Sequence, residues 1–142
     1  MPYAKKVKKK CVEEGTIITN FLQKLKKFNT DESIDVNKVT KILVGCTRFL
    51  MNVSILKRGK EEIFDNGGID IMFDLLNGRS KDDIQLILNI IQCIGNVAEE
   101  PRARVILKNG KYLDIIRGYN NHSDELIKEQ SKLTEEIILW EP

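Results

Sequence analysis

The one histidine of the chain, His122, stands directly before Ser123 and Asp124 in the polar stretch GYNNHSDE. These are the residue types of a general base, a nucleophile and an orienting carboxylate. Catalysis needs such groups to converge in a pocket, and adjacency in a polar loop does not predict one. We therefore expect this segment to be a surface loop and the protein not to be an enzyme.

The three cysteines, Cys11, Cys46 and Cys93, are dispersed, and no CxxC motif is present. An odd number of separated cysteines indicates reduced thiols rather than a disulfide framework. With a single histidine they do not form a zinc-site pattern, and the stretch NGRSK lacks the spacing of a phosphate-binding loop. We expect no metal or cofactor, and we expect the cysteines to act as small core residues.

A basic run near the start of the chain has two interpretations. One is a solvated first helix or frayed end, the usual role of such runs. The other is a site for RNA, a ribonucleoprotein or another polyanion. Only Tyr3 accompanies the run, so base stacking is not supported. The candidate polyanion-binding residues are Lys5, Lys6, Lys8, Lys9 and Lys10.

The chain has 142 residues and a net charge of +2, from 23 basic and 21 acidic residues, which suits one globular domain over residues 1–142. No apolar leader follows the first methionine, and no apolar run reaches the roughly 20 residues of a membrane span. We expect a cytoplasmic location, with cytoskeletal, ciliary and nuclear locations left open.

Apolar residues recur at helical spacing through most of the chain. The clearest stretch, DIQLILNIIQCIGNVA from Asp83, carries a stripe with spacings of three and four. Pro101 then fits the first turn of another helix. No segment alternates convincingly enough to be a strand, so we expect an all-α fold. The stripe is Ile84, Ile87, Ile91, Ile94 and Val97.

Two patterns repeat along the chain. EEIFDNGGIDIMFDLL and VILKNGKYLDIIRG align when Gly67 is set against Gly110, and a third copy aligns at Gly15. The helix from Asp83 likewise aligns with DVNKVTKILVGCTRFLM from Asp35 and with ELIKEQSKLTEEIILW near the end. Glycine disfavours a helix interior, so Gly67 is predicted to mark a corner between a short helix and a medium helix. A helical repeat of about 40–50 residues is typical of a solenoid.

The stretches DNGGIDIMFDLL and IQCIGNVAEEP resemble the helix-corner-helix signature and the third helix of the armadillo repeat. The glycine corner after a short helix distinguishes this pattern from the two-helix HEAT unit. The resemblance implies a right-handed armadillo-like α-solenoid of about three repeats, with the first and last incomplete. The predicted units are residues 1–52, 53–98 and 99–142.

The resemblance also implies a function: a non-catalytic scaffold or adaptor that binds a partner in a groove formed by the third helices. The partner would be an extended or helical protein segment within a larger assembly, with an acidic segment as one alternative. Outward-facing polar side chains of the third helices would bind it, and Trp140 would add an apolar contact at the end. The predicted partner-binding residues are Lys41, Arg48, Asn89, Gln92, Asn96, Lys132 and Trp140.

One well-known groove of this family is not matched. Nuclear-import adaptors carry a tryptophan four residues before a cargo-binding asparagine in successive repeats. Here only Asn96 fits, with Gln92 in the tryptophan position, and Arg48 and Leu139 replace the other asparagines. Nuclear-signal binding is therefore not expected, and Asn96 could instead form a hydrogen bond between helices.

Overall fold

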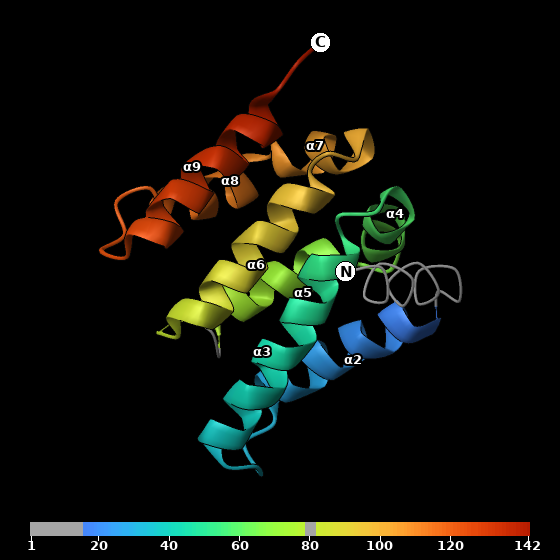
Figure 1. Cartoon of the computed structure of the whole chain (residues 1–142), viewed down its shortest axis with the longest axis vertical. Coiled ribbons are helices and arrows are strands. Elements are labelled where there is room, and N and C mark those ends of the chain that lie inside the picture. Colours follow the sequence, from blue (N-terminus) through green and yellow to red (C-terminus); the bar gives the residue numbers. More distant parts are fainter. Residues whose placement is uncertain (1–15, 79–81) are drawn as a thin grey trace, which may run out of the picture.

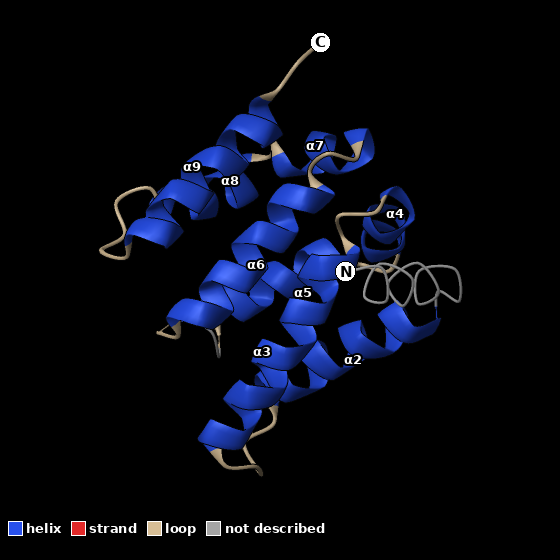
Figure 2. Ribbon diagram, in the orientation of Figure 1, coloured by secondary structure: helices blue, strands red, loops and turns tan. Residues whose placement is uncertain are grey.

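A computed structural model describes residues 16–78 and 82–142, and all regular structure in these ranges is helical (Figure 1). Figure 2 shows the helices joined by short loops. The predicted all-α class is confirmed. None of the helices in the described part is long and apolar enough to cross a membrane. The helices are α2 (Thr16–Thr30), α3 (Val36–Val53), α4 (Lys57–Asp65), α5 (Gly68–Asn77), α6 (Ile84–Val97), α7 (Pro101–Leu107), α8 (Gly110–Gly118) and α9 (Glu125–Leu139).

Four helices begin at a side-chain cap that is visible in the sequence. Asp35 accepts hydrogen bonds from the backbone N–H groups of Asn37 and Lys38 at the start of α3. The residues Asp83, Asn109 and Asp124 do the same for α6, α8 and α9. An aspartate or asparagine at this position satisfies an N–H group that has no partner within the helix, which stabilises the helix start by about 1 kcal/mol.

The glycine corner lies where the sequence predicts it. Helix α4 ends at Asp65, Gly67 has a left-handed φ of 75°, and α5 begins at Gly68. The matching corner before α8 is built differently, because Gly110 is the first helical residue and the Asn109 side chain caps the helix. The third aligned glycine, Gly15, lies outside the described residues.

The long helices α3, α6 and α9 lie side by side, with α6 in the middle (Figure 1). Each also packs against the helix that precedes it in a helix pair: α2 against α3, α5 against α6, and α8 against α9. Their buried aliphatic side chains form the core. It includes Ile18, Leu22, Leu43, Leu50, Met72, Leu76, Ile90, Ile94, Ile116 and Ile138.

The structural offset between α3 and α6 differs from the offset used in the sequence alignment. Their last residues, Val53 and Val97, are 44 positions apart, whereas matching Asp35 with Asp83 uses 48. Helix α3 has 18 residues and α6 has 14, so matching their starts displaces the alignment by one helical turn. The C-terminal ends are the equivalent points, because both run into the same kind of tight connection.

One residue predicted to be core, Ile84, and one further apolar residue, Leu133, are exposed. Ile84, at the first position of α6, is 51% exposed, because the packed part of the helix begins at Leu86. Leu133 of α9 is 49% exposed. The buried residues of that helix are Ile127, Ser131, Thr134 and Ile138, a stripe that leaves Leu133 on another face.

Candidate binding groove

The His122 loop has a structural role at the start of α9. The ring Nδ1 of His122 accepts a hydrogen bond from the backbone N–H of Asp124 at 3.0 Å. The Asp124 carboxylate accepts the N–H of Ile127 at 3.1 Å and so caps the helix. Ser123 is exposed. The histidine and the aspartate therefore hold the loop in shape, and neither interaction orients the Ser123 hydroxyl.

The two cysteines in the described residues occupy core positions, as predicted. Cys46 is 6% exposed and Cys93 is fully buried. Burial raises the pKa of the Cys93 thiol to about 12, and its hydrogen bond with Ser54 and the charge of Lys60 only partly oppose this effect. Burial also raises the pKa of Cys46, opposed by Lys24. Such thiols are poor nucleophiles. Cys11 lies outside the described residues.

Cys93 should accordingly resist alkylation in the native protein. At pH 8 its thiolate fraction is about a thousandfold below that of a free thiol, and iodoacetamide cannot reach it without local opening. Timed labelling followed by peptide mass mapping should find Cys93 unmodified until guanidinium is added, after which all cysteines should react at similar rates. Rapid native labelling of Cys93 would contradict its burial.

Two asparagines predicted to face a partner form hydrogen bonds that join α6 to α3. The Asn89 amide nitrogen lies 3.3 Å from the Val44 carbonyl oxygen and 3.2 Å from the Thr47 hydroxyl. Two turns later, Asn96 repeats the pair with Met51 O at 3.3 Å and Ser54 Oγ at 3.0 Å. The alternative role considered for Asn96, a hydrogen bond between helices, is therefore confirmed.

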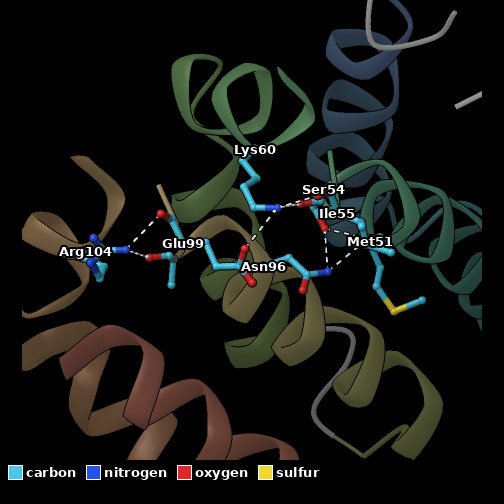
Figure 3. A network of polar contacts seen from close by, with 8 residues as sticks. Met51, Ser54, Ile55, Lys60, Asn96, Glu99 and Arg104 are labelled. Carbon is cyan, nitrogen blue, oxygen red and sulfur yellow. Dashed lines mark hydrogen bonds and ion pairs between the residues drawn. The ribbon is translucent and has the colours of Figure 1, made fainter. Parts of the chain in front are cut away.

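The C-terminal ends of α3 and α6 are held by two basic side chains in the same way (Figure 3). Lys60 of α4 donates to the carbonyl oxygens of Ser54 and Ile55, at 2.7 and 2.8 Å. Arg104 of α7 donates to those of Ala98 and Glu99, at 3.0 and 2.9 Å. Carbonyl groups at a helix end have no partner within the helix, so each cation caps two of them.

A groove crosses α3, α6 and α9 on the face away from their buried sides. Its central part encloses about 360 Å³. A second hollow of about 330 Å³ continues from it towards the end of α9, and the two share Glu99, Leu133 and Ile137. The central part is lined by Met51, Ile55, Gln92, Gly95, Asn96, Glu99, Gln130, Leu133 and Ile137. The second is lined by Glu99, Arg104, Leu133, Glu136, Ile137 and Trp140.

Three of the seven predicted partner-binding residues line this groove. Gln92 and Asn96 lie in its central part, and Trp140, which is 55% exposed, lies in the second hollow. The Trp140 ring is stacked against Arg104, with the guanidinium carbon 5.2 Å from the ring centre. A large, half-exposed aromatic ring beside a groove is a typical anchoring point for a partner.

The other four lie elsewhere. Asn89 is only 1% exposed, so its predicted outward position is wrong: its amide is used within the fold. Lys41 and Arg48 are exposed on α3 beside the groove. Lys132 is exposed on α9 and lines neither hollow, although Glu136, four residues later on the same helix face, lines the second.

The sequence interpretation missed the apolar lining. Ile55, Leu133 and Ile137 line the groove but are absent from the predicted partner-binding residues, although the first two are 60% and 49% exposed. One signal was available: Gln130, Leu133, Ile137 and Trp140 recur at spacings of three and four on α9. That stripe is separate from the buried one, which predicts a helix with two apolar faces.

Comparison of the chain with protein-family models, with curated proteins and with solved structures finds no match. Among the described residues, no group of three or more histidine, cysteine, aspartate or glutamate side chains is placed to hold a metal ion. The side chains that line the groove offer apolar surface, side-chain amides and a few charges.

Proposed function

We propose that this protein is a non-catalytic binding module, an armadillo-like right-handed solenoid that holds a segment of another protein in the groove across α3, α6 and α9. The groove itself carries the proposal. It combines exposed apolar surface at Ile55, Leu133 and Trp140 with the amide of Gln92, which forms no hydrogen bond to any residue that the structure describes. Apolar surface supplies affinity, and an amide can bond to a partner's backbone.

The repeated contacts support the solenoid part of the proposal. Lys60 and Arg104 are 44 positions apart, and each caps the carbonyl groups five and six positions before it. Asn89 and Asn96 each bond to a carbonyl 45 positions earlier and a hydroxyl 42 positions earlier. Such regularity is expected when equivalent helices stack in a repeat array. The division into units 1–52, 53–98 and 99–142 is part of this proposal.

Affinity capture from a native extract of the source cells tests the function. The groove variant combines Ile55→Ser with Leu133→Ser, and the matched control combines Val36→Ser with Val105→Ser. All four side chains are exposed and apolar, but only the first pair lines the groove. Partners that bind to wild type and to the control should be lost from the groove variant, as judged by quantitative mass spectrometry.

Nuclease treatment and a variant with the five N-terminal lysines changed to glutamine complete the experiment. The polyanion hypothesis depends on those lysines, Lys5, Lys6, Lys8, Lys9 and Lys10, which lie outside the described residues. Binding through phosphates should fall steeply with salt and with nuclease, whereas an apolar groove contact should not. If the lysine variant loses all partners and the groove variant loses none, the groove proposal is wrong.

A further inference from the structure

The groove carries an ordered arrangement of charge that no single helix reveals. Arg48 precedes Met51 by three residues and Ile55 by seven, so it lies on the groove face of α3, and Lys41 lies on that face two turns earlier. On α9, Glu136 lines the second hollow, and Glu129 precedes Leu133 by four residues on the same face. The groove face therefore presents cations on α3 and carboxylates on α9.

These charges are not neutralised by the fold. Lys41, Arg48, Glu129 and Glu136 are all exposed, and no hydrogen bond or ion pair within residues 16–78 and 82–142 engages their side chains. The other charged groups at the groove are occupied. Arg104 caps α6, and the Glu99 carboxylate lies 3.5 Å from the Lys60 ammonium.

The two outer helices of the groove differ in the same sense. Helix α3 contains three basic and no acidic residues, whereas α9 contains two basic and four acidic residues. Such an asymmetry produces a potential difference between the α3 side and the α9 side of the groove, which orients a charged partner as it approaches.

Apolar surface lies between the charged sides. Met51 and Ile55 of α3 and Leu133 and Ile137 of α9 line the central part of the groove. Gln92 lies midway, and its amide bonds to no other group in the described part of the chain. An amide offers one acceptor and two donors, which matches the backbone N–H and C=O of an extended segment.

From this arrangement we infer that the groove selects an extended protein segment of mixed charge, with carboxylates over α3, apolar side chains in the middle and lysine or arginine over α9. This inference rests on the proposed function and specifies its partner. Packed helices lie about 8–10 Å apart, so α3 and α9 are about 20 Å apart. An extended chain covers that distance in about six residues.

Three fluorescein-labelled octapeptides with the same four apolar central residues test the inference. One carries two glutamates at one end and two lysines at the other, one has glutamates at both ends, and one has lysines at both. Fluorescence anisotropy should show that wild type binds the mixed peptide about tenfold more tightly than either uniform peptide. One end of a uniform peptide loses a favourable charge contact and meets a like charge instead.

Charge reversal on the protein should change the preference in a defined way. The Arg48→Glu variant should prefer the lysine-only peptide, and the Glu136→Arg variant should prefer the glutamate-only peptide. Lys26→Glu reverses a charge on α2, which lines neither part of the groove, and is the matched control, so it should keep the wild-type preference. All three side chains are exposed, and circular dichroism will verify that the variants fold alike.

Three outcomes would each overturn the inference. The three peptides could bind equally, or the mixed peptide could fail to bind up to about 1 mM. The third is a peptide preference that stays the same in the Arg48→Glu and Glu136→Arg variants. If extract partners are still lost from the Ile55→Ser, Leu133→Ser variant, the groove binds a segment of another chemistry and only the inference fails. If those partners also remain bound, the proposed function fails with it.

Discussion

Replacement of Gly59 by alanine should lower the free energy of unfolding by about 3 kcal/mol, because the start of α4 lies directly against the end of α3. A Cβ atom at Gly59 would lie 1.9 Å from the Val53 carbonyl oxygen and 2.7 Å from its carbon. Both are backbone atoms, so no side chain can rotate to make room. The connection between the two helices would have to open, which would also expose buried Val53.

Gly45→Ala provides the matched control. Gly45 lies within α3, and a Cβ atom there would meet nothing within 4 Å. Alanine favours a helix interior by about 1 kcal/mol over glycine, so this variant should be slightly more stable than wild type. Urea unfolding followed by circular dichroism measures both. Similar midpoints for the two variants would contradict the close approach of α4 to α3.

Replacement of Lys60 by methionine should destabilise the protein by about 2–3 kcal/mol. The Lys60 side chain is 10% exposed and satisfies the carbonyl oxygens of Ser54 and Ile55 at the end of α3. Methionine fills a similar volume but donates no hydrogen bond, so both carbonyl groups lose their charged donor. The loss should appear as a lower urea midpoint with an unchanged slope.

Two further variants identify the cause of that loss. Glu99→Gln removes the ion pair of Lys60 but leaves its hydrogen bonds, and it should cost less than about 0.5 kcal/mol, because the Glu99 side chain is 56% exposed. Arg104→Met removes the equivalent cap from α6 and should cost less than Lys60→Met, since Arg104 is only partly buried. A larger loss for Glu99→Gln than for Lys60→Met would show that charge pairing, not capping, holds this connection.

These contacts bear on binding as well as on stability. Lys60 and Arg104 fix the ends of α3 and α6, where Ile55 and Glu99 line the groove (Figure 3). Asn96 joins the same two helices one turn earlier. A groove whose walls are tied together in the free protein loses little conformational freedom on binding, which favours affinity.

Local features of the structure could be predicted from the sequence. The helical class, the corner at Gly67 and the caps at Asp35, Asp83 and Asp124 depend on residues within a few positions of one another. Periodicity also identified the buried face of α6 from Ile87 to Val97. In each case the deciding interaction is a helical turn or a cap, which the neighbouring residues alone determine.

The register between helices and the composition of the groove depended on contacts that only the tertiary structure reveals. Asn89 and Asn96 have the same residue type and the same helical face, yet one is buried and the other lines the groove. The 44-residue offset follows from the connections after α3 and α6, which Gly59, Lys60 and Arg104 shape through contacts with backbone atoms. A one-turn error in that offset set Arg48 against Asn96, whereas at the structural offset Arg48 matches Gln92. The reason is physical. Helix periodicity defines which residues share a face of one helix. Packing against a second helix decides which face is covered, and which residues of the two helices lie opposite each other.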